Sequence, residues 1–149
     1  MLMEGIAKTV RSFFSSATQI IMLAIRITVG VIFMQTGYGK LMNLSATTDY
    51  FASLHIPMPA LNAAMAAGTE LVGGTLIVLG LLTRLAAIPL TGVMIVAIVT
   101  AKLPEVKEWS DFIRLQEWDY ILFFLALFGL GAGTWSLDTL FFKGNKKKS

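Results

Sequence analysis

The sequence predicts an all-α integral membrane protein, a four-helix bundle that crosses the bilayer with both termini in the cytoplasm. Hydrophobic residues make up 56% of the chain and charged residues only 14%, whereas a typical soluble domain is about 25% charged. Four long runs contain almost no charged residue. Because these runs are apolar all round rather than along one stripe, they are typical of helices that face lipid.

Each of the four predicted spans is close to the ~20 residues that a helix needs to cross the hydrocarbon core. The spans cover about residues 18–38, 60–82, 85–103 and 118–138. A very short turn, Thr83 and Arg84, joins the second span to the third. Pro89 lies near the start of the third span, where a helix tolerates proline best.

The segments before, between and after the four spans differ from them in composition. Residues 1–17 form a basic lead whose apolar residues follow helical spacing, which predicts an amphipathic segment at the membrane interface or a mobile tail. Residues 18–142 form the membrane domain, and residues 143–149 form a basic tail. Of the two longer connections, residues 41–59 contain two prolines, and residues 102–117 are predicted to include a short interfacial helix.

Lysines and arginines are divided unequally between the two sides of the predicted bundle. With an even number of spans both termini share a side, and that side has seven basic residues: Lys8, Arg11, Arg84, Lys143, Lys146, Lys147 and Lys148. The other side has four: Lys40, Lys102, Lys107 and Arg114. Since basic flanks stay on the cytoplasmic side, both termini are predicted to lie there.

Composition also excludes several kinds of chemistry. Cysteine is absent, which excludes disulfides, cysteine-ligated zinc, iron–sulfur clusters and thiol redox chemistry. With His55 as the single histidine, a bis-histidine haem within one chain is excluded and no metal site is predicted. No serine–histidine–aspartate set, phosphate loop or HExxH motif is present. The basic residues lie at membrane flanks, so the net charge of +3 does not indicate nucleic-acid binding.

Two ionisable residues lie inside predicted spans, Arg26 in the first and Glu70 near the centre of the second. A charge at that depth costs at least ~2.5–3.5 kcal/mol, so each needs a partner, water or neutralisation. Both lie on stripes that also carry small residues, which let helices approach closely in lipid. The first stripe contains Arg26, Gly30, Phe33, Gly37 and Lys40, and the second contains Asn62, Ala66, Glu70, Gly74 and Ile77.

From these stripes we predict that Arg26 and Glu70 meet, or share a hydrated pocket, between the first two helices. Two interpretations stay open for them. They form either a polar site that binds the head group of a small molecule or passes protons, or an ion pair that only fixes the helix register. The glycines expected at helix contacts are Gly30, Gly37, Gly73, Gly74, Gly129 and Gly133.

The fourth span carries a similar pattern. Glu117, Phe124, Gly131 and Asp138 follow one another at intervals of seven, and Gly129 with Gly133 forms a GxxxG motif. Asp138 ends on the same side as Arg84, so a pair between them is plausible, although a surface pair would contribute little. On the opposite side Glu117, Asp119 and Lys40 either rim an opening or are ordinary solvated charges at the interface.

Four segments follow one another along the chain: RITVGVIF and then GYGKL in residues 26–41, FASLHIP in 51–57, ELVGG and then LGLLTR in 70–84, and GAGTWSLD in 131–138. In this order they resemble the DoxX family of small bacterial membrane proteins. The resemblance covers about residues 20–140. It implies a four-helix protein of the bacterial cytoplasmic membrane, and some members of the family are membrane subunits of a thiosulfate:quinone oxidoreductase.

Three functions are compatible with this sequence. The favoured one is a membrane subunit or anchor of a redox-linked assembly, with a soluble oxidoreductase as partner and a quinone or other head group bound between the first two helices. A polar interior would then include Arg26, Lys40, Glu70, Arg84, Glu117 and Asp138. The alternatives are a non-catalytic scaffold, chaperone or adaptor, and a small permease, which an oligomer of this chain would have to form.

Overall fold

The computed structural model describes the backbone of residues 2–142 and the side chains of residues 13–141, and this part of the chain contains helices and loops but no strand. The predicted all-α class is therefore confirmed. The helices are α1 (Leu2–Met42), α2 (Leu44–Ser53), α3 (Pro59–Leu79), α4 (Thr83–Ala97), α5 (Trp109–Ile113), α6 (Gln116–Leu130) and α7 (Leu137–Phe142). A π-helical turn (Ile98–Lys102) and a 3₁₀ turn (Leu103–Glu105) extend α4.

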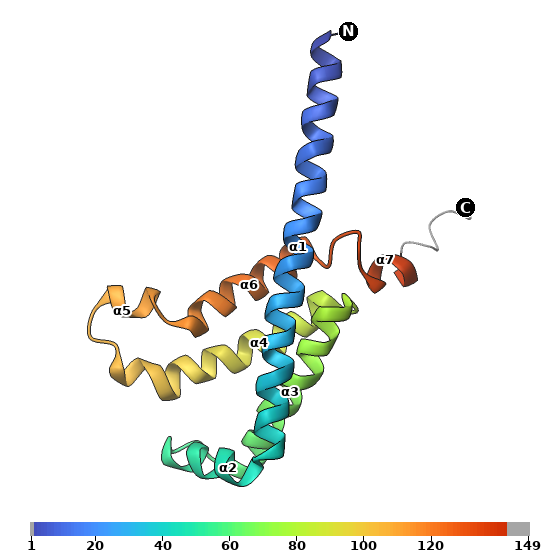
Figure 1. Ribbon diagram of the computed structural model, residues 1–149. Coiled ribbons are helices and arrows are strands. Elements are labelled where there is room, and N and C mark those ends of the chain that lie inside the picture. The colour runs from blue at the N-terminus through green and yellow to red at the C-terminus, as the bar shows by residue number, and fades with distance from the viewer. Residues whose placement is uncertain (1, 143–149) are drawn as a thin grey trace.

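The helices associate as two hairpins. Helix α3 runs back along the lower half of α1, and α6 runs back along α4 (Figure 1). Helix α2 folds against α3 at one end of the molecule, and we call this the α2 end. The opposite end contains the α3–α4 turn and the chain after α6, and we call it the α7 end.

Helix α1 is one continuous helix of 41 residues, or ~60 Å at 1.5 Å per residue. The backbone of the lead from residue 2 onward thus continues the axis of the first span beyond the other helices (Figure 1). In the described part of the chain, three segments are long and apolar enough to cross a membrane: Phe13–Met42, Pro59–Leu79 and Thr83–Glu105. The basic tail at 143–149 lies outside the described residues.

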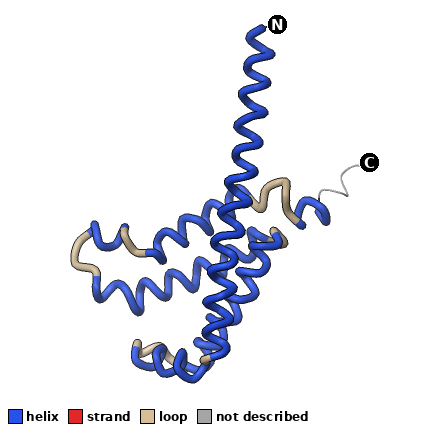
Figure 2. The backbone as a smooth tube through the Cα atoms, viewed as in Figure 1, coloured by secondary structure: helices blue, strands red, loops and turns tan. Residues whose placement is uncertain are grey.

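The predicted fourth span, residues 118–138, is broken in the structure. Helix α6 ends at Leu130 after 15 residues, and a loop separates it from α7 (Figure 2). Gly131 and Gly133 have φ angles of 78° and 77°, which L side chains rarely adopt and which end the helix. The GxxxG interpretation is wrong, because Gly133 is not helical and a Cβ on Gly129 would meet open space.

Glycines bring α1 and α3 into close contact. A Cβ on Gly37 would lie 2.4 Å from the backbone nitrogen of Leu71, and one on Gly74 would lie 2.7 Å from the carbonyl oxygen of Gly30. Such backbone-to-backbone approach is typical of helix packing in lipid. Gly73 makes room for the neighbouring helix instead, since a Cβ there would meet Leu90 of α4 at 2.9 Å.

The two longer connections both contain a helix. Helix α5 lies in the second connection, where a short helix was predicted, and begins with a capping box between Glu108 and Asp111. The first connection contains α2, which was not predicted. Its two serines and two threonines are poor helix formers, so the sequence pattern alone does not indicate a helix there, and α2 packs against α3 without burying any residue completely.

Candidate functional site

Arg26 is buried, with 2% of its surface exposed, and it joins two helix ends at the α7 end. Its Nε and Nη2 atoms donate to the carbonyl oxygens of Ile77 and Val78, both at 3.0 Å, in the last turn of α3. Its Nη1 atom donates to the carbonyl oxygens of Ala132 and Trp135, at 2.7 and 2.8 Å, in the loop after α6. The carbonyls at a helix C-terminus lack partners within the helix, so a guanidinium satisfies them well.

Gln19 holds the same loop from one heptad earlier on α1. Its Oε1 atom accepts hydrogen bonds from the backbone nitrogen of Thr134 at 2.6 Å and from its hydroxyl at 3.0 Å. Sequence reasoning missed this residue. The available signal was its position seven residues before Arg26, which places both side chains on one face of the helix.

Arg84 and Asp138 lie close to each other but do not pair. Arg84 Nη2 donates to the carbonyl oxygen of Gly129 at 3.1 Å, near the C-terminus of α6. The Asp138 carboxylate accepts from the backbone nitrogens of Leu82 at 2.7 Å and Thr83 at 3.3 Å, at the N-terminus of α4. The suggested pair is therefore wrong. Each side chain caps a helix end of opposite partial charge. The cation lies at a C-terminus, and the carboxylate lies at an N-terminus.

Glu70 pairs with Lys40 rather than with Arg26. The Lys40 Nζ atom bonds Glu70 Oε1, and the Glu70 side chain is 1% exposed against 34% for Lys40. The predicted meeting of Arg26 and Glu70 is wrong, and Arg26 does not line the cavity that Glu70 faces. The other carboxylate oxygen of Glu70 is buried and has no hydrogen-bond partner among the described residues.

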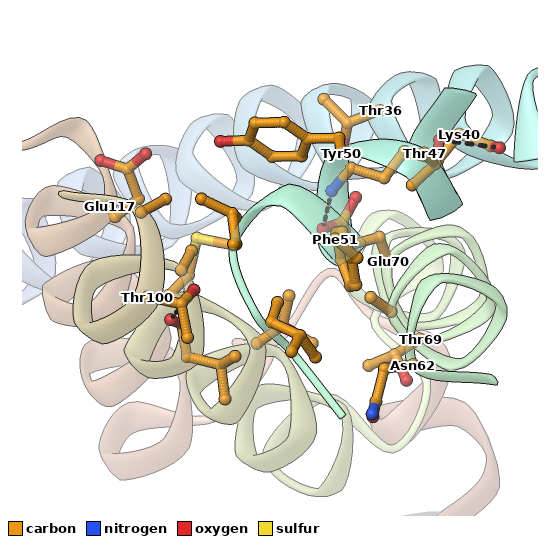
Figure 3. A pocket seen from close by; sticks show the side chains of 18 of the residues that line it. Thr36, Lys40, Thr47, Tyr50, Phe51, Asn62, Thr69, Glu70, Thr100 and Glu117 are labelled. Atoms are coloured by element: carbon orange, nitrogen blue, oxygen red, sulfur yellow. Dashed lines mark hydrogen bonds and ion pairs between the residues drawn. The ribbon is translucent and has the colours of Figure 1, made fainter. Parts of the chain in front are cut away.

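A cavity of about 840 Å³ opens at the α2 end, where the two hairpins diverge (Figure 3). Helices α1, α2, α3, α4 and α6 and the π-helical turn all contribute to its wall. Most of the lining side chains are apolar, and four are aromatic: Phe33, Tyr50, Phe51 and Tyr120. The cavity falls in the size range of small-molecule sites, ~300–1,000 Å³.

Four charged side chains line the cavity, and they form two pairs. The first is Lys40 with Glu70, drawn with a dashed line in Figure 3. In the second, Lys102 Nζ lies 3.9 Å from Glu117 Oε1. Because the formal charges cancel, the cavity favours an uncharged ligand over an ion.

The residues predicted to form one polar interior thus lie in two separate groups. Along α1 the groups are separated by about the thickness of one bilayer leaflet. Lys40, Glu70 and Glu117 line the cavity at the α2 end. Arg26, Arg84 and Asp138 hold helix ends together at the α7 end. Arg26 and Lys40 are 14 positions apart on α1, or ~21 Å at 1.5 Å per residue.

A π-helical turn forms part of the cavity wall. Thr100, Ala101 and Lys102 line the cavity and belong to this turn, which widens the helix after α4. Such turns occur frequently at functional sites in helices. His55 is exposed in the loop before α3, and residues 2–142 contain no group of three or more histidine, aspartate or glutamate side chains with the geometry to hold a metal ion.

Comparison with known proteins fits this architecture. The DoxX family profile matches residues 21–103, which include α1 from the middle onward, α2, α3 and α4. This chain belongs to the DoxX family. No solved structure matches it significantly.

Three relatives of this DoxX protein are known by name. It is 34% identical to "Putative oxidoreductase CatD" of Bacillus subtilis over 83% of this chain and 89% of that one. It is 43% identical to "Inner membrane protein YphA" of Escherichia coli over 51% and 55%. It is 33% identical to "Uncharacterized membrane protein Rv3486" of Mycobacterium tuberculosis over 78% of each chain. With several candidate spans and these relatives, the chain is a multi-pass protein of the bacterial cytoplasmic membrane.

Proposed function

We propose that this DoxX protein is the membrane subunit of a redox-linked assembly and binds a quinone in the cavity at the α2 end. The observation that carries the proposal is the buried Lys40–Glu70 pair in the wall of a cavity that is otherwise largely apolar. Small-molecule sites combine an apolar lining with a few placed polar groups in this way. The name of one relative, "Putative oxidoreductase CatD", supports the redox assignment.

The residues of the cavity suit a quinone in three respects. The volume of about 840 Å³ accommodates a ring with part of an isoprenoid chain. Tyr50, Phe51 and Tyr120 offer aromatic faces and edges to a flat ring. Lys40 carries ammonium hydrogens that can reach a carbonyl oxygen of the ring, while Glu70 leaves one carboxylate oxygen free to bond.

A quinone, when bound, supplies two-electron, two-proton chemistry that this chain's own side chains lack. The residues of the cavity would hold the ring, bond its oxygens and keep bulk water away. The electrons would come from a partner, which we propose is a soluble oxidoreductase anchored by this protein. The caps at the α7 end, made by Arg26, Arg84 and Asp138, would keep the helices in place for this site.

Filling the cavity tests the site. Ala66 lines the cavity on α3, and Ala66→Trp should reduce the quinone and quinol extracted together from the purified protein to the background level. The bulky indole would occupy the space that the ring needs, without touching the helix caps at the other end. Quinone content is measured by chromatography, and folding by circular dichroism and size-exclusion profile.

Leu61→Trp is the matched control, because Leu61 lies on the same helix, is 51% exposed and does not line the cavity. This variant should retain the quinone of the unmodified protein. A folded Ala66→Trp protein with undiminished quinone would refute this site and would favour the scaffold alternative, in which the buried charges are structural.

A further inference from the structure

Glu70 has an unusual hydrogen-bonding state. One carboxylate oxygen bonds the Lys40 ammonium, and the other is buried without a partner. The residue is 1% exposed and lines the cavity. An ionised carboxylate only accepts hydrogen bonds, so the second oxygen needs a donor. A buried acceptor without a donor is costly in proteins and therefore rare.

Two hydroxyl groups in the cavity wall already donate their hydrogens to backbone carbonyl oxygens. Thr36 donates to the carbonyl oxygen of Phe33 at 3.2 Å, and Thr47 donates to that of Asn43 at 3.0 Å. Among the described residues, therefore, these two side chains do not supply the missing donor. A ligand in the cavity is placed to supply it, because Glu70 is part of the cavity wall.

The two redox forms of a quinone differ at this point. A quinone has carbonyl oxygens, which only accept, whereas a quinol has hydroxyl groups, which both donate and accept. Either form can accept a hydrogen bond from Lys40. The quinol alone can also donate one to the free oxygen of Glu70.

We infer that the cavity binds the reduced, hydroxyl-bearing form of its ring ligand more tightly than the oxidised form, because only that form satisfies the second oxygen of Glu70. This inference rests on the proposed function. In this role Glu70 discriminates between the two redox forms of the ligand, and the site stabilises the quinol. One satisfied buried acceptor corresponds to a preference of about tenfold or more.

A preference for the reduced form raises the midpoint potential of the bound couple above that of the free couple. For a two-electron couple, each tenfold difference in affinity corresponds to about 30 mV. The protein would therefore draw electrons toward its bound quinone from the partner that reduces it. The sign of the shift in midpoint potential distinguishes a site whose quinone accepts electrons from a site whose quinol donates them.

The test uses the full-length protein in nanodiscs, titrated without oxygen with a short-chain benzoquinone analogue and, separately, with its quinol. We expect the quinol to bind at least about tenfold more tightly. In Glu70→Gln the amide can donate to a quinone carbonyl, so the preference should shrink or reverse. Asp119→Asn is the control, since Asp119 is exposed on α6 and does not line the cavity, and it should keep the preference.

The two failures are distinguishable. If the unmodified protein binds both forms equally, or the quinone more tightly, the inference about Glu70 is overturned while the quinone site stands. If it binds neither form, the proposed function fails and the inference with it. The comparison in the unmodified protein decides without any variant, so poor folding of Glu70→Gln would not obscure the answer.

Discussion

Replacing Arg26 with Met should lower the free energy of unfolding by about 3–5 kcal/mol, the largest loss expected from a single substitution in this protein. Four backbone carbonyl oxygens, two at the end of α3 and two in the loop after α6, would lose the Arg26 donor in buried or part-buried positions. The carbonyl oxygen of Ile77 would keep its bond from the Gly80 nitrogen, and the other three would lose the donor described for them. Met keeps much of the length and apolar volume of the arginine stem, so the loss reports mainly on the hydrogen bonds. The measurement is a denaturation curve in detergent, followed by circular dichroism.

Arg84→Met is the matched control for this substitution. Arg84 lies at the same end of the molecule but makes a single hydrogen bond to a backbone carbonyl, and that bond is exposed. Its loss should cost less than about 1 kcal/mol. Equal stabilities of the Arg26 and Arg84 variants would contradict the assignment of Arg26 as the side chain that joins the ends of α3 and α6.

Replacing Gly37 with Ala should destabilise the α1–α3 hairpin by about 1–3 kcal/mol. The new Cβ would lie 2.4 Å from the backbone nitrogen of Leu71 and 2.7 Å from the carbonyl oxygen of Ala67. These are backbone atoms, so rotation of a side chain cannot relieve the overlap and the two helices must separate. The free energy of unfolding in detergent measures this effect directly.

Gly39→Ala is the control, and its expected effect on stability has the opposite sign. Gly39 lies two residues further along α1, and a Cβ there would meet nothing within 4 Å. Alanine is a better helix former than glycine by roughly 0.5–1 kcal/mol, so this variant should be slightly more stable than the unmodified protein. Destabilisation of both variants to the same extent would show that glycine content, and not close helix contact, determines the effect.

Hydropathy and spacing predicted the helical membrane architecture and the contact face of α1 correctly. The stripe that begins at Arg26 and ends at Lys40 does face α3. Spacing alone could not give the axial offset between the two helices. Their antiparallel register places Gly37 against Leu71, so Lys40 lies beside Glu70, whereas Arg26 lies at the far end of α3. The pairing of Arg26 with Glu70 failed for this reason.

The break after α6 was not predicted because glycine has two structural roles in membrane proteins. It allows helices to pack closely, and it adopts the positive φ angles that end a helix. Gly129 and Gly133 fit a helix-packing motif, but Gly133 adopts a positive φ and belongs to a loop. The loop is stabilised by α1, through Gln19 and Arg26, so its conformation depends on contacts more than 100 positions away in the chain. Local pattern carries no information on such contacts.

The cavity itself had only an indirect signal in the sequence. Spacing indicated Glu117, Asp119 and Lys40 as charges that could rim an opening, and two of them, Glu117 and Lys40, line the cavity. Its existence depends on the divergence of the two hairpins, on α2 and on the π-helical turn, none of which follows from hydrophobic periodicity. The free oxygen of Glu70 became apparent only when its partner was known to be Lys40.

The most direct test of the redox-subunit assignment is purification of the tagged protein from its native membranes in mild detergent, with mass spectrometry of co-purifying proteins and extracted lipids together. We expect an oxidoreductase to co-purify, together with quinone or quinol in an amount comparable to that of the protein chain. A partner without redox cofactors, and no enrichment of quinone over the bulk membrane, would contradict the assignment and would identify this DoxX protein as a scaffold.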